Sequence, residues 1–328
     1  MRAWLVEQLG DPREALRLRD LPDPTPEPGT VTIRVEAAAL NFFDILLCQG
    51  RYQERPPLPF TPGAEVAGTV EAVAPDVGPW PRPGDRVVAR PVLPRGGLAE
   101  RVVVPAGGVY PIPAAMPSDE AAAGFITYQT AYYALFSRTN TRPGETVLVH
   151  AGAGGVGSAA IQLARSVGAR VMATAGGPEK VAVARRLGAD EVVDYLAEDF
   201  GPRVHGWTEG RGVDVIVDPV GGDVFDRSRR VVAFDGRILV IGFAAGRIPD
   251  IPANHVLLKN YAVIGVHWGL FERLDPAGVR AIHERLMALY RDGAIRPWIS
   301  ARYPLEGVVD ALEALYHRRT VGKVVVLP

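Results

Sequence analysis

A glycine-rich segment in the middle of the chain constrains its fold more than any other feature. The apolar run Thr146–Val149 leads into Gly152, Gly154 and Gly157, and a helix-like segment follows. This order matches the dinucleotide-binding fingerprint, in which glycines let the backbone approach a pyrophosphate at the free N–H groups of a helix N-terminus. A tight turn without a ligand is the alternative. The second strand-like run, about 20 residues further on, favours the dinucleotide site.

From residue 145 onward, strand-like and helix-like segments alternate, which predicts a parallel sheet covered by helices. Six strands with crossover helices would form the two halves of a doubly wound Rossmann fold. The predicted strands are Thr146–His150, Arg170–Thr174, Glu191–Asp194, Val213–Asp218, Arg237–Ile241 and Tyr261–Val266. The predicted helices are Gly155–Val167, Pro178–Leu187 and Val224–Phe234, with a further helix at Ser118–Ser137 before them.

Proline marks a different kind of structure at the start of the chain. Nineteen of the 29 prolines lie in the first 117 residues, among short strand-like runs such as Val31–Val35 and Arg86–Ala89. Proline is excluded from helix interiors and central strands, so this region is predicted to be an irregular, mostly β domain. After the Rossmann segments, the tail is expected to contain helices near Asp275–Asp292 and Val308–His317 and a strand at Lys323–Leu327.

The residues after the second predicted strand bear on the choice of cofactor. A site for NAD usually has an Asp or Glu about 20 residues after the first glycine, where it binds the ribose 2′-hydroxyl. This chain has Ala175, Gly176 and Gly177 there, with Lys180 close behind. A lysine attracts a 2′-phosphate that a carboxylate would repel. Lys180, with Tyr195 after the third strand, therefore predicts NADPH, although a solvated lysine on a first helical turn is the alternative.

Several short segments carry a family resemblance. They are Asn41–Asp44, Gly50–Tyr52, Pro59–Gly68, Gly84–Val87, Thr130–Tyr133, Asp218–Gly222, Leu257–Asn260 and Val321–Lys323. Together with the glycine-rich segment, they resemble the zinc-independent quinone oxidoreductases of the medium-chain dehydrogenase/reductase superfamily. The resemblance implies an α/β protein with a GroES-like, mostly β catalytic domain (residues 1–120 and 268–328) and a Rossmann NADPH-binding domain (residues 121–267). It also implies that the cofactor lies in the cleft between the domains.

The resemblance also implies the residues of the site. Tyr52 and Asn41 are the expected catalytic residues: Tyr52 as a proton donor or a packing lid, and Asn41 as a group that orients the substrate oxygen or a ribose hydroxyl, or caps its loop. Asp44 is expected to brace the same loop. The predicted cofactor-binding residues are Asn41, Thr130, Tyr133, Gly152, Ala153, Gly154, Gly155, Val156, Gly157, Gly176, Gly177, Lys180, Tyr195, Val220, Gly242, Phe243, His267, Trp268 and Lys323.

The ligands of a catalytic zinc are missing from the expected positions. Zinc alcohol dehydrogenases of this superfamily hold the metal with two cysteines and a histidine in a Gly-His-Glu segment. This chain has Asn41 and Ala64 at the matching places, its histidines are scattered, and Cys48 fits neither position. Zinc sites need three or four N, S or O ligands, so no metal is predicted. Glu65, which survives from that segment, has a catalytic role or pairs with a nearby arginine.

These features predict an enzyme that transfers a hydride from NADPH to a quinone or another α,β-unsaturated carbonyl compound. Without a Lewis acid, such a site needs an acceptor that is already electron-poor. An enoyl-thioester reductase is the alternative in the same class. An NADPH-binding structural or RNA-binding protein, of the crystallin-like kind, is the alternative in another class.

Composition limits the partners. The net charge of −1 offers no basic surface for nucleic acid or an anionic membrane. No apolar run approaches the roughly 18 residues that span a bilayer, and Glu7 interrupts any signal-like start, so a cytoplasmic protein is expected. The uncharged segment Tyr261–Val266 predicts a sheet edge that pairs two copies into a homodimer, unless the chain's own tail covers it. Cys48 lies among apolar residues and is expected to be buried and inert.

Overall fold

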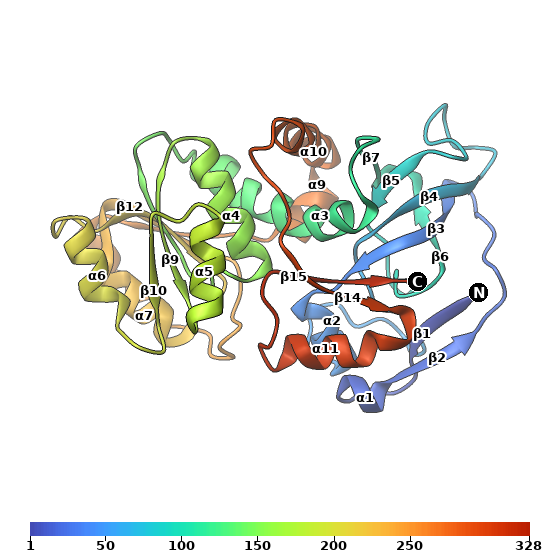
Figure 1. Ribbon diagram of the computed structural model, residues 1–328, viewed down its shortest axis with the longest axis horizontal. Helices are drawn as coiled ribbons and strands as arrows, with labels where there is room; N and C mark the ends of the chain where they lie inside the picture. Colours follow the sequence, from blue (N-terminus) through green and yellow to red (C-terminus); the bar gives the residue numbers. More distant parts are fainter. The chain divides into compact units, whose positions relative to one another are not determined.

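The computed structural model describes residues 1–328, which divide into two compact units. Unit 1 consists of Met1–Ile126 and Pro297–Pro328, and unit 2 consists of Thr127–Arg296. Figure 1 shows the elements of both units, coloured along the chain. No helix combines the length with the apolar composition that crossing a bilayer demands.

Unit 2 is built on a six-stranded sheet in which every neighbouring pair of strands is parallel. The chain runs outward from β8 to one edge and then from β11 to the other, so the strand order reverses between these two strands. In spatial order, the strands are β10 (Glu191–Asp194), β9 (Arg170–Ala175), β8 (Thr146–Val149), β11 (Val213–Asp218), β12 (Val232–Val240) and β13 (Ala262–Gly265). This order confirms the predicted doubly wound Rossmann fold.

Helices cover both faces of this sheet. Helices α4 (Gly155–Ser166) and α5 (Pro178–Arg186) lie on one face, and α6 (Phe200–Trp207) and α7 (Gly222–Val231) lie on the other (Figure 1). All four positions of β8 are buried, as expected for a central strand of a sheet that is covered on both faces. Helix α6 and the short helix α8 (Ala253–Lys259) were not predicted from the sequence.

Unit 1 contains a mostly antiparallel sheet, which confirms the predicted β-rich domain. Its strand order is β14 (Ile299–Pro304), β15 (Lys323–Leu327), β3 (Thr30–Ala39), β4 (Val66–Val73), β5 (Arg86–Ala89) and β7 (Val109–Pro111), and β6 (Arg101–Pro105) also pairs with β3. A separate ribbon pairs β1 (Arg2–Val6) with β2 (Leu16–Asp20). Its helices include α1 (Pro12–Ala15), α2 (Phe42–Cys48) and α11 (Val308–Tyr316), and the first part of α3 (Ser118–Tyr132) also lies in this unit. The C-terminal strand β15 lies between β14 and β3, so the sheet needs both ends of the chain.

The division into units differs from the predicted domain boundaries. The predicted Rossmann domain ended at residue 267, whereas α9 (Trp268–Leu274) and α10 (Pro276–Arg291) lie within unit 2. The Phe271 ring in α9 stacks on Tyr133 with 4.2 Å between ring centroids. Gln129 donates from Nε2 to the Val279 carbonyl in α10 at 3.2 Å. These contacts attach the two helices to α3 (Ser118–Tyr132) and to the π-helical turn η2 (Tyr133–Arg138).

Candidate functional site

The glycine-rich loop joins β8 to α4, and its glycines are required by close backbone contacts. Gly154 is the N-cap of α4, and Ala151 just before the loop has a φ of 49°. A Cβ on Gly157 would lie 2.2 Å from the Ala151 carbonyl oxygen. A Cβ on Gly152 would lie 2.8 Å from the Cβ of Ala173 in β9. The first N–H groups of α4 have no acceptor within the helix, so the loop offers donors to an anion.

Most of the predicted cofactor residues of unit 2 follow the carboxyl end of a strand. Because all six strands are parallel, these positions lie along one edge of the sheet. They are Gly152–Gly157 after β8, Gly176 and Gly177 after β9, Tyr195 after β10, Val220 after β11, Gly242 and Phe243 after β12, and His267 and Trp268 after β13. Thr130 and Tyr133 lie instead on α3 and η2, which precede the sheet.

The loop after β9 has no acid at the strand end, as predicted. Gly177 is the N-cap of α5 with a φ of 87°, and Lys180 is the half-buried third residue of that helix. A Cβ on Gly176 would lie 2.5 Å from the Tyr195 hydroxyl, so the tyrosine packs directly on this loop. Sequence reasoning missed Asp194, whose Oδ1 accepts hydrogen bonds from the N–H of Gly177 at 2.9 Å and of Leu196 at 3.0 Å.

The buried His150 links the carboxyl ends of β8 and β9 to helix α7. His150 Nδ1 lies 3.1 Å from the Thr174 hydroxyl, and Nε2 lies 2.8 Å from the Ser228 hydroxyl in α7. Ser228 donates to the Val224 carbonyl at 2.8 Å, so it accepts from His150 Nε2–H and Thr174 donates to Nδ1. Burial, together with the charge of Arg227, lowers the pKa of His150 to about 3. His150 is therefore a neutral structural residue.

Asp218 shapes the loop after β11. Its Oδ1 accepts hydrogen bonds from the N–H of Val220 at 2.8 Å and of Gly221 at 2.9 Å. Burial raises the pKa of this carboxyl group, and Oδ2 is buried without a partner. Gly221 and Gly222 both have positive φ, so the turn relies on glycine. The carboxylate thereby fixes the position of Val220, a predicted cofactor residue that the sequence alone did not connect with Asp218.

In unit 1 the structure brings together three residues that lie far apart in the sequence. Lys323 Nζ donates to Glu65 Oε1 at 2.6 Å and to Asn41 Oδ1 at 2.7 Å. Asn41 Nδ2 donates to the same Glu65 oxygen at 2.8 Å, so the three groups form a closed triangle. Glu65 Oε2 accepts from the Ile126 N–H at 2.7 Å. The predicted arginine partner of Glu65 was therefore wrong: the partner is Lys323.

Asp44 braces the same loop, as predicted. Its Oδ2 accepts from the Asn41 N–H at 2.8 Å, which caps α2, and its Oδ1 accepts from the Gly63 N–H at 3.2 Å. Burial raises the pKa of Asp44 to about 7. Cys48, at the other end of α2, is fully buried, as predicted, and burial raises the pKa of its thiol to about 12, which disfavours the reactive thiolate.

Tyr52 follows α2 and is half-buried. Its ring stacks on Phe43 with 5.4 Å between ring centroids and an interplanar angle of 29°. Burial raises the pKa of its hydroxyl, with a smaller contribution from Glu54, so the group is protonated at neutral pH. This geometry suits a proton donor and an aromatic lid equally well, and both roles remain predictions.

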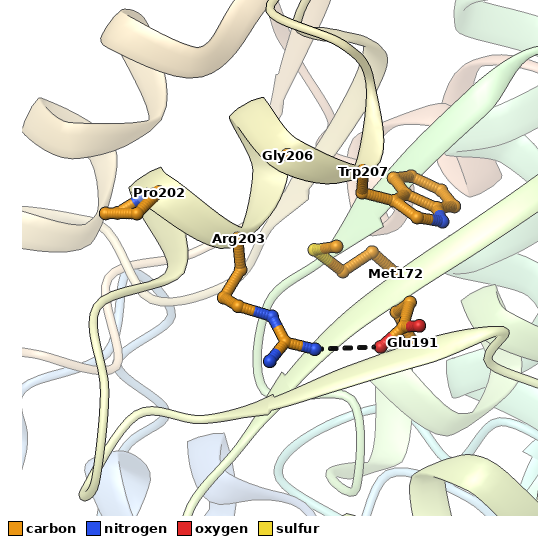
Figure 2. A pocket seen from close by; sticks show the side chains of 6 residues that line it. All are labelled: Met172, Glu191, Pro202, Arg203, Gly206 and Trp207. Carbon is orange, nitrogen blue, oxygen red and sulfur yellow. Dashed lines mark hydrogen bonds and ion pairs between the residues drawn. The ribbon is translucent and has the colours of Figure 1, made fainter.

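A pocket of about 190 Å³ lies at the opposite edge of the parallel sheet. Figure 2 shows its lining by Met172, Glu191, Pro202, Arg203, Gly206 and Trp207, with an ion pair between Arg203 and Glu191. Glu191 begins β10, and Trp207 ends α6 shortly before β11 begins, so the pocket lies where strands start. None of the predicted site residues lines it.

Comparisons with known proteins agree with this arrangement. Residues 27–114 match the alcohol dehydrogenase GroES-like domain, and residues 155–283 match the zinc-binding dehydrogenase family. A quinone oxidoreductase-like protein 2 homolog from Nematostella vectensis is 40% identical over 299 residues, which cover 90% of this chain and 81% of that protein. The chain belongs to the quinone oxidoreductase family of the medium-chain dehydrogenases/reductases.

Solved structures extend the comparison over the complete fold of this quinone oxidoreductase family member. The mycobacterial protein Rv1454c, complexed with NADPH, is 36% identical, with a TM-score of 0.92 and coverage of 100% of both chains. The Escherichia coli quinone oxidoreductase, also complexed with NADPH, is 28% identical, with a TM-score of 0.92 and the same coverage. Both NADPH-bound proteins have the same fold as this chain, in which the glycine-rich loop joins the first strand of the parallel sheet to a helix.

The residues of this quinone oxidoreductase family member do not fit a zinc ion, although one matching family is described as zinc-binding. No group of three or more His, Cys, Asp or Glu side chains is placed to share an ion. At the positions that correspond to zinc ligands, Asn41 offers an amide that is bonded to Lys323 and Glu65, and Ala64 offers no ligand atom. The Lys323 ammonium group already bonds to Glu65 there.

Proposed function

We propose that this quinone oxidoreductase family member transfers a hydride from NADPH to a quinone or another α,β-unsaturated carbonyl compound without a metal ion. The end of β9 carries the proposal, because Ala175, Gly176 and Gly177 contribute no carboxylate side chain and Lys180 follows close behind. The NADPH complexes of two relatives with the same fold support this assignment. When bound, the cofactor supplies the hydride. The protein orients the cofactor and stabilises the negative charge that develops on the substrate.

Asp194 is the feature that weighs against NADPH. Its carboxylate lies next to the Gly177 N–H and would repel a 2′-phosphate if the phosphate came close. Two N–H groups share Oδ1, which fixes the carboxylate against the loop backbone. Lys180 stands one turn into α5 and carries the opposite charge. The preference between NADPH and NADH therefore depends on the balance between Lys180 and Asp194.

The absence of zinc ligands limits the substrate class. Without a Lewis acid, an alcohol or a simple ketone is not activated for hydride transfer, whereas a quinone or an enone already carries an electron-poor carbon. Negative charge then develops on an oxygen of the acceptor, and a protonated phenol can donate to it. Tyr52 is the proposed donor because its phenol is protonated at neutral pH and its ring stacks on Phe43 in α2, the helix that Asn41 caps.

The oxidation of NADPH, followed by its absorbance, tests this function against a panel of benzoquinones, naphthoquinones, enals and enoyl-CoA esters. Turnover of quinones or enals with NADPH, and much weaker turnover with NADH, is the expected result. Turnover restricted to enoyl-CoA esters would identify an enoyl-thioester reductase instead. Tight NADPH binding with no turnover, combined with RNA retention in a filter assay, would favour the crystallin-like alternative.

We also propose that β13 pairs with its copy in a homodimer. β13 is the last strand of the sheet and bonds only to β12, which leaves its other edge open. The tail strand β15 pairs with β14 and β3 in the sheet of unit 1, so it does not extend β13. An open, uncharged strand edge favours pairing with another chain, and two-fold symmetry closes such a pair.

A further inference from the structure

The hydrogen-bonded triangle of Lys323, Glu65 and Asn41 leaves the ammonium group no hydrogen to donate elsewhere. Lys323 Nζ has three N–H groups, and it bonds to Glu65 Oε1, Asn41 Oδ1 and the Leu40 carbonyl, the last at 2.9 Å. The lysine side chain is 3% exposed and that of Glu65 is fully buried. Direct binding of a cofactor by Lys323, which the family resemblance implied, would require one of these bonds to break.

The same triangle fixes which way the Asn41 amide points. Its oxygen faces the ammonium and its nitrogen faces the carboxylate. A flipped amide would direct N–H groups at the ammonium and an oxygen at the carboxylate, so both hydrogen bonds would be lost. Two charged partners therefore determine the orientation of one neutral side chain.

The fixed orientation leaves Asn41 an acceptor rather than a donor. One N–H of the amide donates to Glu65, and Nδ2 also lies 3.5 Å from the Ala39 carbonyl. Oδ1 accepts one bond from Lys323. The Asp44 N–H faces the same side chain in the capping box of α2 but bonds to the Asn41 backbone carbonyl at 3.1 Å, so Oδ1 keeps a lone pair for a further donor. Asn41 is half-buried, whereas its two charged partners are buried, so the amide is the exposed corner of the triangle.

We propose that Lys323 and Glu65 are positioning residues that hold the Asn41 oxygen ready to accept a hydrogen bond from a hydroxyl of the nicotinamide ribose. The inference rests on the proposed function, because it assumes that a nicotinamide dinucleotide is the cofactor. Of the two ligand-binding roles expected for Asn41, it selects the ribose: a substrate carbonyl or a developing oxyanion has no hydrogen to donate, so Asn41 serves the ribose and Tyr52 serves the substrate oxygen.

The first experiment compares Asn41→Ala with Asn41→Asp by fluorescence titration with NADPH. Asp keeps an oxygen at the acceptor position but turns its other oxygen toward Glu65, so it is combined with Glu65→Gln, which removes the repulsion between two carboxylates. The Kd of this combined variant should stay within about threefold of the wild-type value, whereas Ala should weaken NADPH binding about three- to tenfold, the effect of one hydrogen bond. Equal losses in both variants would overturn the acceptor role. Binding of 2′,5′-ADP, which lacks the nicotinamide half, should change by less than about twofold in either variant.

The second experiment opens the triangle without leaving a buried charge. Lys323→Met combined with Glu65→Gln removes both charged partners, and the Kd for NADPH should rise as much as it does in Asn41→Ala. Adding Asn41→Ala to this pair should cost less than about twofold more, because the groups act as one unit. If the loss of NADPH affinity in the triple variant equals the product of the losses in the double variant and in Asn41→Ala, Lys323 contacts the cofactor itself. An unchanged Kd in the double variant would show that the triangle does not position Asn41.

The outcomes separate the inference from the proposed function. Wild-type protein that fails to bind NADPH contradicts both. If the wild-type protein binds NADPH and the triangle variants bind it with the same Kd as the wild type, only the inference is contradicted. A parallel loss of 2′,5′-ADP binding would show that the fold of the protein is disturbed and would contradict a positioning role. If the paired variant does not fold, the comparison of Ala with Asp at position 41 still decides the acceptor role.

Discussion

The ammonium of Lys323 lies 2.6 Å from Oε1 of Glu65, although 258 positions separate the two residues in the sequence. The pair links β15 to the residue just before β4, and both side chains are almost completely buried. A buried charge that loses its partner is expensive, because it has neither water nor a counter-charge.

Removing Lys323 should therefore destabilise the protein strongly. Lys323→Met leaves the Glu65 carboxylate buried and unpaired, and the free energy of unfolding should fall by about 3–5 kcal/mol. The exposed pair of Arg13 and Asp310, 3.2 Å apart, provides the control, since Arg13→Met should cost at most about 1 kcal/mol. Urea denaturation measures both variants, and a similar small loss in each would contradict the buried pair.

Lys180→Ala should weaken NADPH binding about 10- to 100-fold and leave NADH binding nearly unchanged. The estimate follows from the loss of one charged hydrogen bond to a 2′-phosphate, which is worth about 1.5–3 kcal/mol. Fluorescence titration with both cofactors measures the effect. Asp194→Asn is the matched variant: if its carboxylate repels the phosphate, NADPH binding should tighten. Equal losses for NADPH and NADH in Lys180→Ala would refute this cofactor assignment.

Tyr52→Phe should lower enone turnover at least about tenfold, a threshold set below the roughly 100-fold low end of the effect of a positioned general acid. Quinone turnover should fall less, because the reduced quinone can take its proton from water. Tyr52→Ala separates the alternative role, in which the ring that stacks on Phe43 only covers the cofactor. In that case Phe would keep both activities and Ala would damage both, as steady-state rates on one enone and one quinone would show.

Val263→Pro should convert the dimer into a folded monomer. The Val266 N–H donates to the Val240 carbonyl in β12, and alternation along the strand therefore turns the N–H of Val263 toward the open edge. Proline there removes a donor that only a second copy could use. Light scattering at micromolar concentration measures the mass. Ile264→Pro, which removes a bond to β12, should lower stability instead. A monomeric wild-type protein with intact activity would contradict the dimer.

Asp44 should make the protein less stable as the pH rises through about 7. The folded pKa of about 7 exceeds the ordinary 3.8, so the folded state holds a proton that the unfolded state has released. The contribution of protonated Asp44 to the free energy of unfolding is complete below about pH 4 and is lost as the pH passes 7. Asp44→Asn should remove this dependence, so its stability relative to wild type should increase between about pH 5 and pH 8 in urea denaturation. A constant difference would contradict the raised pKa.

His150 has the opposite effect on the pH dependence of stability, because it makes the protein less stable as the pH falls. It therefore provides the control at low pH. Its folded pKa of about 3 lies below the ordinary 6.5, so its contribution is complete above 6.5 and declines as the pH falls toward 3. A loss of stability between about pH 6.5 and pH 5 that persists in Asp44→Asn belongs to His150, because paired carboxylates such as Glu100, with a pKa lowered from 4.5, lose their contribution only at lower pH.

The Rossmann core could be predicted from the sequence because its signals are local. The spacing of Gly152, Gly154 and Gly157 locates the start of α4 correctly, and the strand Glu191–Asp194 is predicted with its observed bounds. Helix α6 was missed because Gly201, Pro202 and Gly206 interrupt an already short helix. Its helical form depends on the Asp199 side chain, which accepts from the Gly201 N–H, and on the burial of Phe200 and Val204.

The contacts between distant segments could not be read in the same way. No local signal connects Glu65 with Lys323 or Asp194 with Gly177, because each pair meets only after the strands that carry it are paired. The lack of a local signal also explains why the predicted domain boundary at residue 267 left α9 and α10 outside the Rossmann domain. Their attachment to unit 2 depends on contacts such as Gln129 with Val279, 150 positions apart.

The place of β15 inside the sheet of unit 1 has a consequence for synthesis. Unit 2 is one continuous stretch, so it has all its strands once residue 296 has left the ribosome. Domains fold as units during synthesis, so unit 2 can fold while unit 1 still lacks β14 and β15. Until the last residues emerge, the Glu65 carboxylate has no counter-charge and β3 lacks its partner strand at Ala38 and Ala39. The unit whose synthesis begins first is thus the last to be completed.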